Sequence, residues 1–332
     1  MKRLVGLMML ITVCSACLDD YPKAPASPFE SQAVAMVENL SNPASGLIAS
    51  RPGECFTTVY KNALAAMVFL HQGNHKSADA IFDRFDNFRL SLSEPFRGFP
   101  KDWDACLGTP TNTNYWEGDN AFLLMALNYQ YITSGRSNKY KELRSELVSW
   151  LVLRSQQCES IIAEGTANMY AALLPHASDP AVSQALVHLK NCFEASVDYS
   201  NVLDHTVRGT LVFGDTTGFA SVGNFKRTET WVYNSTSISA YSAFSGDSFI
   251  NVEISAQLLL ASILSAQSSR FPGLRQELEK LWIYQHNGRE SGQPYFLTNI
   301  GFDNSATLPI VDPTAYMLFA YWRLNPFMAG NP

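Results

Sequence analysis

The sequence predicts an all-α fold built from pairs of helices. Apolar residues recur three and four positions apart through most of the chain, the spacing that gives a helix one buried face. Breaks rich in Gly, Asn or Ser, such as 72–74 and 134–138, have the length of turns between paired helices. Alternating patterns are almost absent, and 211–213 is the best, short, strand candidate. This order of elements fits either a closed ring of hairpins or an open stack.

The predicted helices follow from this periodicity one by one. Asp179-Pro180 places a capping residue and then proline at the start of one of them. Three irregular segments, 92–118, 198–228 and 286–311, are longer than compact packing requires, so we expect them to carry function. The amphipathic segments are 31–40, 60–71, 78–88, 120–132, 140–153, 167–174, 181–197, 235–244, 252–266, 274–284 and 313–324.

The first 17 residues predict export from the cytoplasm. Lys2 and Arg3 precede an apolar run, 4–13, that is too short for a stable membrane anchor. Ser15 and Ala16 then precede Cys17, so the segment resembles a bacterial lipoprotein signal with Cys17 as the lipidated residue. The resemblance implies attachment to the membrane through the lipid. In the enterobacterial sorting rule, Leu at position 18 implies the outer membrane.

The rest of the chain is predicted to form a tether, 18–30, and one domain, 31–332. The tether contains three prolines and few apolar residues. Hydrophobic residues make up 46% of the chain, which is enough for a substantial core. The formal net charge is −6 and no Lys/Arg cluster is present, so we expect no nucleic-acid partner. Aromatic residues reach 12%, a composition compatible with surfaces that stack on sugar rings.

Cysteine usage predicts disulfides rather than a metal centre. Four cysteines remain after the signal, and an oxidising compartment permits three pairings among them. We favour Cys55–Cys106 and Cys158–Cys192, which tie neighbouring segments. No pair has CxxC spacing and the histidines are scattered, so we expect no metal and no cofactor.

Several segments together resemble the six-hairpin glycosidase superfamily. The strongest is 115–127, YWEGDNAFLLMAL, followed by 140–151, YKELRSELVSWL, which is similar to a "GDNAW" segment that opens an inner helix and its outer partner. The resemblance extends in order over most of 56–327 and implies an (α/α)6 toroid. The other segments that carry it are 59–70, 73, 77–82, 163–174, 228–231, 251–260, 294–295 and 312–327.

The sequence departs from the superfamily's pattern at three places. Lys61 stands where the first hairpin commonly has an acid, and Phe122 replaces the tryptophan of the "GDNAW" segment. Ile254-Ser255 replaces the Gly-Thr expected after Glu253. These departures do not change the predicted fold, but they weaken the prediction of catalytic activity.

The resemblance implies glycoside hydrolysis, which generally uses two carboxyl groups at one glycosidic bond. Acids at the starts of inner helices are the candidates, because those helix ends face the central cleft. We prefer Asp119 and Glu164 as the pair and keep Glu253 and Glu229 in reserve. Asp119 could also act as a helix cap, and Glu164 could accept hydrogen bonds from the backbone amides of its own turn. For Glu229 and Glu253 the alternative role is structural hydrogen bonding inside the barrel. Asp312, before a proline, is expected to be a cap.

Four aromatic residues near these acids or in the long segments are candidate sugar-stacking residues. They are Tyr115, Trp116, Trp231 and Tyr295. For the two tryptophans, the alternative is packing between inner and outer helices.

Two functions from different classes follow. The first is a lipid-anchored glycoside hydrolase of a poly- or oligosaccharide in the cell envelope. The second is a non-catalytic toroid that binds a glycan or a protein there, as the departures at Lys61 and 254–255 would permit. An open helical scaffold for protein assembly is a third interpretation.

Overall fold

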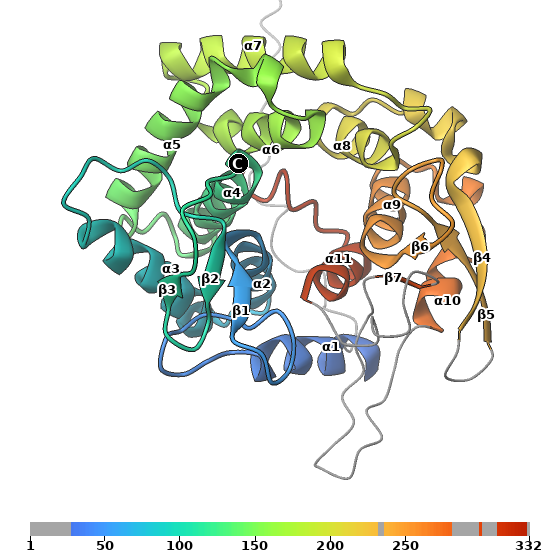
Figure 1. Cartoon of the computed structure of the whole chain (residues 1–332), viewed down its shortest axis with the longest axis horizontal. Helices are drawn as coiled ribbons and strands as arrows, with labels where there is room; N and C mark the ends of the chain where they lie inside the picture. The colour runs from blue at the N-terminus through green and yellow to red at the C-terminus, as the bar shows by residue number, and fades with distance from the viewer. Residues whose placement is uncertain (1–27, 232–235, 281–298, 301–310, 331–332) are drawn as a thin grey trace, which may run out of the picture.

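The computed structural model describes residues 28–231, 236–280, 299–300 and 311–330. Within these residues, helices form a closed inner ring: each packs against the next, and the last packs back onto the first (Figure 1). The predicted all-α toroid is therefore confirmed, and the closed ring rather than the open stack is its architecture. The ring consists, in order, of α2 (Val59–His71), α4 (Glu117–Thr133), α6 (Ala163–Leu173), α8 (Leu203–Phe213), α9 (Val252–Leu264) and α11 (Val311–Trp322).

An outer layer covers this ring, and the core lies between the two. The outer helices are α3 (His75–Leu90), α5 (Lys141–Ser155), α7 (Pro180–Ser196), α10 (Leu274–Glu279) and α1 (Pro28–Asn39). In that order, they pack on α2, α4, α6, α9 and α11. Neighbouring helices enclose the inner ring, so a helix there can be apolar on nearly all sides. In α2, every position from 62 to 70 is buried.

A β-hairpin stands where a helix is predicted over 235–244. Strand β4 (Lys226–Trp231) pairs antiparallel with β5 (Thr236–Tyr241), after the short 3-10 turns η3 (Thr217–Ala220) and η4 (Val222–Phe225). The helix prediction is wrong here because the burial has a period of two: Ile238 and Ala240 are buried, whereas Ser237 is exposed.

The predicted strand at 211–213 is also wrong. These residues form the last turn of α8, which ends at Gly214 in the left-handed conformation, with φ of 70°. That glycine is a favourable helix terminator because it has no Cβ to clash. The segment 198–228, predicted as an irregular loop, thus contains an inner helix.

Short strands precede two inner helices. Strand β1 (Phe56–Thr58) leads into α2 and pairs with β2 (Asp102–Asp104), and β3 (Thr109–Pro110) completes that sheet. Strand β6 (Ile250–Asn251) leads into α9 and pairs with β7 (Asn299–Ile300). The remaining 3-10 turns are η1 (Cys158–Ser160), η2 (Leu174–His176) and η5 (Ser268–Arg270).

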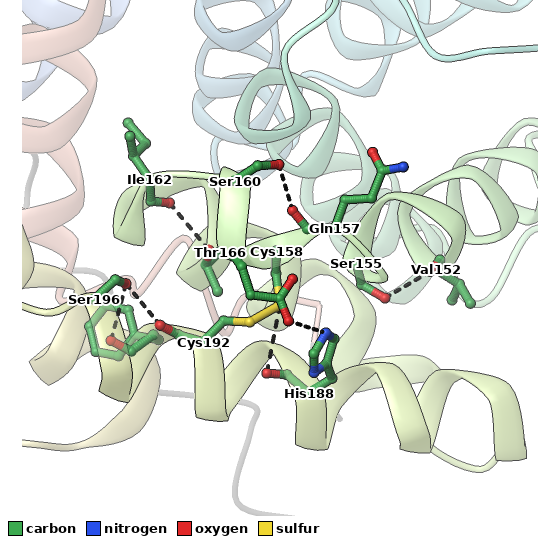
Figure 2. The surroundings of a disulfide bond; sticks show 12 residues. Val152, Ser155, Gln157, Cys158, Ser160, Ile162, Thr166, His188, Cys192 and Ser196 are labelled. Atoms are coloured by element: carbon green, nitrogen blue, oxygen red, sulfur yellow. Dashed lines mark hydrogen bonds and ion pairs between the residues drawn. A yellow bond between two sulfur atoms is a disulfide. The ribbon is translucent and has the colours of Figure 1, made fainter.

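Two disulfides join the cysteines in the pairing that we favour from the sequence. Cys55 is bonded to Cys106, and Cys158 to Cys192, with Cα–Cα distances of 5.1 and 6.0 Å. Figure 2 shows the second bond, which ties η1 to α7 just before α6 begins. It closes a loop with a sequence separation of 34, a constraint that stabilises a fold by about 3–4 kcal/mol.

The predicted signal segment with Cys17 and the aromatic residue Tyr295 lie outside the described residues. Helix α1 begins at Pro28, within the last residues of the predicted tether. Of the helices in the described ranges, none combines the length and apolarity needed to cross a bilayer.

Candidate functional site

Acidic side chains gather where the inner helices begin. Five of the ring helices place a carboxylate in their first turn, and α2 places Tyr60 and Lys61 there. Contacts between these turns bring the same ends of the helices together: Lys61 Nζ lies 3.3 Å from Asp312 Oδ2, and Tyr60 Oη donates to Glu253 Oε1 at 2.8 Å. We call the five carboxylates the acid ring: Asp119, Glu164, Asp204, Glu253 and Asp312.

Asp119 is the most enclosed member. Its residue is 1% exposed, and neither carboxylate oxygen has a hydrogen-bond partner among the described residues. It is not a cap, because α4 has Trp116 as its N-cap residue and no side-chain cap. Burial raises the pKa of Asp119 to about 8, against the opposing attraction of Lys101. Asp119 is therefore protonated at neutral pH.

Local contacts fix the start of α4 and with it Asp119. The next residue, Asn120, accepts a hydrogen bond from the Phe99 amide at 2.7 Å and donates to the Phe99 and Trp116 carbonyls at 3.0 Å. Gly118 allows close packing: a Cβ there would lie 3.0 Å from the Trp116 ring and 3.2 Å from Asn168 Nδ2, tighter than most Cβ contacts. The Gly-Asp-Asn order of the sequence thus positions the acid.

Glu164 differs from Asp119 in its exposure and in its pairing with an arginine. Arg208 Nη2 lies 3.2 Å from Glu164 Oε1 and 3.3 Å from Asp204 Oδ1, so one guanidinium serves two carboxylates. Arg208 is 1% exposed, whereas 29% of the Glu164 side chain is exposed. Burial raises the pKa of Glu164 to about 7, with Asp204 adding to the rise and Arg208 opposing it. Arg208 therefore favours the ionised form of Glu164.

Glu253 is oriented by two hydrogen bonds. Besides the Tyr60 hydroxyl, Gln257 Nε2 donates to Glu253 Oε1 at 3.0 Å. The helix start is fixed because Asn251 Oδ1 accepts from the Ile254 amide. Burial raises the pKa of Glu253 to about 8, and the charge of Asp312 adds to it. The Tyr60 hydroxyl also lies 3.1 Å from that of Tyr316.

Buried polar atoms without a protein partner surround the acid ring. Such atoms are uncommon in folded proteins and cost free energy unless something pairs with them. Within the described residues they include both oxygens of Asp119, both amide atoms of Asn168, Gln257 Oε1, Arg208 Nη1 and Asp312 Oδ1.

Three of the four acids predicted from the sequence lie in this ring. Asp119, Glu164 and Glu253 all belong to first turns of inner helices. The expected position of Glu229 at the start of an inner helix is wrong: it lies in β4, opposite Ile238 of β5, because β4 and β5 form a hairpin. Asp312, expected to be a cap, instead pairs with Lys61 and belongs to the ring.

Sequence reasoning misses Asp204, Arg208 and Tyr60. Asp204 and Arg208 escape it because 198–228 has the pattern of a loop, although their spacing of four is a signal for an ion pair on one helix face. Tyr60 belongs to a predicted helix, but only the ring closure shows that it meets Glu253, 193 residues away.

The candidate aromatic residues occupy different environments. Tyr115 is 46% exposed just before α4, as expected of a residue that can stack on a sugar. Trp116 is half-buried, with Lys101 Nζ 5.5 Å from its ring centroid. Trp231 ends β4, and Tyr295 lies outside the described residues.

Metal-ligating side chains cluster only around the disulfides in the part of the chain that the structure describes. These clusters are Cys158, Glu159, His188 and Cys192, and Cys55, Asp104 and Cys106. In each, the two thiols are bonded to one another, so few ligands remain. Glu159 Oε1 and His188 Nε2 lie 3.3 Å apart and form a partly exposed surface pair.

Comparisons with known proteins bear on the fold. The sequence matches no protein-family model and no curated protein. A wild-type glycosidase structure matches with a TM-score of 0.66 at 11% identity, covering 90% of this chain and 96% of that one. A sugar epimerase from a ruminal bacterium matches at 0.61 and 12% identity, covering 89% and 98%. A D-mannose isomerase matches at 0.60 and 10% identity, covering 92% and 99%. The chain therefore has the toroid fold of these glycosidases and sugar-processing enzymes.

Proposed function

We propose that this chain is a glycoside hydrolase that acts on a poly- or oligosaccharide at the acid ring. The observation that carries the proposal is the contrast between two neighbouring carboxyl groups. Asp119 is enclosed, unpaired and protonated at neutral pH, whereas Glu164 is partly exposed and paired with Arg208. Burial raises the pKa of both groups, to about 8 for Asp119 and about 7 for Glu164, where Arg208 opposes the rise. The group that ionises at the lower pH is the candidate base, and the other is the candidate acid.

In this mechanism Asp119 donates its proton to the leaving glycosidic oxygen as the bond to the anomeric carbon breaks. Glu164, in the ionised form that Arg208 favours, either takes a proton from the attacking water or attacks the anomeric carbon itself. Glu253, held by Tyr60 and Gln257, is placed to accept hydrogen bonds from sugar hydroxyls and remains the reserve acid. Tyr115 offers an exposed ring for stacking.

The toroids of similar fold are glycosidases and sugar isomerising enzymes by their descriptions, which supports a sugar ligand. The test is a screen of the purified protein against neutral and charged oligosaccharides, with binding and reducing-sugar release measured in parallel. Release establishes hydrolysis. Saturable binding with no release would instead favour the non-catalytic glycan-binding toroid, and absence of both would contradict a sugar ligand.

The released-sugar rate is expected to depend on pH as a narrow bell. Activity needs Glu164 ionised, which occurs as pH rises through about 7, and Asp119 protonated, which is lost as pH rises through about 8. Because the two groups interact, the two limbs belong to the pair. Rates measured from about pH 5 to about pH 10 test this, and an optimum below about pH 6 would contradict the assignment.

We also propose that Cys17 carries a lipid that holds the protein at the outer membrane. Lys2, Arg3, the apolar run 4–13 and Ser15-Ala16 support this. In a bacterial host, Cys17→Ser is expected to abolish incorporation of labelled fatty acid and to move the protein from the detergent phase to the aqueous phase. Cys14→Ser is the matched control and should keep the label, and a labelled Cys17→Ser protein would rule out this anchor.

A further inference from the structure

A cavity lies at the opposite end of the inner helices from the acid ring. It has a volume of about 560 Å³ and lies among the ends of α4, α5 and α7 and the turn η2. Tyr131 lines it from the end of α4, 12 residues beyond Asp119. At 1.5 Å per helical residue, that places it about 18 Å away along the helix axis. The cavity is therefore separate from the proposed sugar site.

Three cations line this cavity without a carboxylate partner. Arg136, Lys141 and Arg144 all contribute to its wall, and in the described part of the chain none forms an ion pair. Arg144 is half-buried, with its guanidinium 4.0 Å from the centroid of the Tyr131 ring, which holds it in place. Nearby, by contrast, Lys139 pairs with both Asp79 and Asp83.

The backbone and the turn after α4 fix Arg136 at the rim. Gly135 and Arg136 both have positive φ, 68° and 67°, and the Arg136 amide donates to the Tyr131 carbonyl at 2.7 Å. A non-glycine residue in the left-handed region costs free energy, so it persists only where the surrounding turn imposes that conformation. The turn therefore fixes the backbone of Arg136.

The remaining polar groups in the wall include one imidazole and one carboxylate. His176 contributes its imidazole, with Nε2 3.0 Å from Asn128 Oδ1, and burial together with the charge of Arg144 lowers the pKa of His176. The acid in the wall, Asp179, is occupied as a helix cap that accepts from the Ala181 and Val182 amides. The hydroxyl groups in the wall belong to Tyr131, Ser145, Ser149 and Ser178, and that of Ser149 donates to the Ser145 carbonyl.

We propose that this cavity is a binding site for a phosphate or sulfate group. Two guanidinium groups and one ammonium group line the cavity, against the single carboxylate of Asp179, and such cationic donors are the chemistry that recognises a tetrahedral oxyanion. Such a group can be carried by a small phosphorylated or sulfated sugar or by an anionic lipid headgroup. The site does not depend on the proposed hydrolase activity.

The experiment titrates the purified full-length protein with inorganic phosphate and with sulfate at constant ionic strength, by calorimetry. Saturable binding is expected, and Arg144→Gln and Lys141→Gln are each expected to weaken it about tenfold or more, because each removes a charge-assisted hydrogen bond. Lys141 is exposed, so its variant separates loss of binding from loss of folding. Lys190→Gln, on the exposed side of α7 and paired with Glu194, is the control and should bind as the parent does.

Further arms compare glucose 6-phosphate with glucose, and vesicles of phosphatidic acid with vesicles of phosphatidylcholine. Arg144-dependent binding to the phosphorylated sugar identifies a small ligand, and Arg144-dependent binding to the acidic vesicles alone identifies a headgroup. No saturable binding by any probe at tens of millimolar anion, or binding that both variants retain in full, overturns the site.

Discussion

Asp119→Asn is expected to lower the rate of glycoside release by about 100- to 10,000-fold, the usual contribution of a positioned general acid. The amide has nearly the same shape as the carboxyl group but has no acidic proton to give to the leaving oxygen. Sugar binding should persist, because the amide oxygen and the amide nitrogen of asparagine can still form hydrogen bonds to a sugar. The measurement is turnover under saturating substrate together with ligand affinity by calorimetry.

The matched control is Glu142→Gln, an acid in the first turn of the outer helix α5. It makes the same chemical change at a helix start, on an exposed residue, and should leave turnover unchanged. Glu164→Gln should lose activity as Asp119→Asn does. If both site variants kept parental rates, the assignment of this acid pair would be wrong.

Stability gives an independent readout of Asp119. Its folded pKa, about 8, is above the value near 3.9 expected in the unfolded chain, so the unfolded state loses its proton first. The parent should therefore lose stability between about pH 4 and pH 8, by up to about 1.4 kcal/mol per pH unit from this group. Asp119→Asn lacks that slope and should be the more stable protein at about pH 8. Urea unfolding of both proteins across this pH range measures the difference in their free energies of unfolding. If the free energies of the parent and of Asp119→Asn changed with pH in the same way, the raised pKa would be contradicted.

Local sequence patterns predict a ring helix when its apolar residues recur at helical spacing and polar residues occupy its first turn. In α4, Gly118, Asp119 and Asn120 precede a long apolar run, so both the helix and its acid are recognisable. Glu164 and Glu253 are recognisable for the same reason. A helix start in an inner ring faces the centre, and the closed ring then brings its acids together.

Local patterns fail where the segment has mixed preferences. Helix α8, LDHTVRGTLVF, contains Gly209 and several β-branched residues, which weaken the helical signal. Packing against α6 and α9 overrides these preferences. Asp204 and Arg208 therefore escape prediction together, although they determine the charge environment of Glu164. The hairpin β4–β5 escapes it because small and polar residues alternate with few apolar ones.

Arg208→Met is expected to destabilise the fold by about 3–5 kcal/mol at neutral pH, the loss typical of removing one partner from a buried ion pair. Arg208 is 1% exposed, and its removal leaves Asp204 and Glu164 as neighbouring carboxylates with no cation between them. Methionine keeps much of the apolar packing against the Phe327 ring, whose centroid lies 4.8 Å from the guanidinium. Chemical unfolding at several pH values is the measurement.

The chain contains a close control for this substitution. Arg275 also pairs with an acid on its own helix, Glu279, four residues away, and its guanidinium also lies over an aromatic ring, that of Tyr321, at 3.9 Å. The difference is exposure: 53% of the Arg275 side chain is exposed, so Arg275→Met should cost about 0–1 kcal/mol. The Arg208→Met deficit should also shrink as pH falls and the unpaired carboxylates take up protons, because only their ionised forms are penalised by burial. Equal losses in the two variants, or a deficit that does not change with pH, would mean that Arg208 stabilises the ring by packing and does not keep Glu164 ionised.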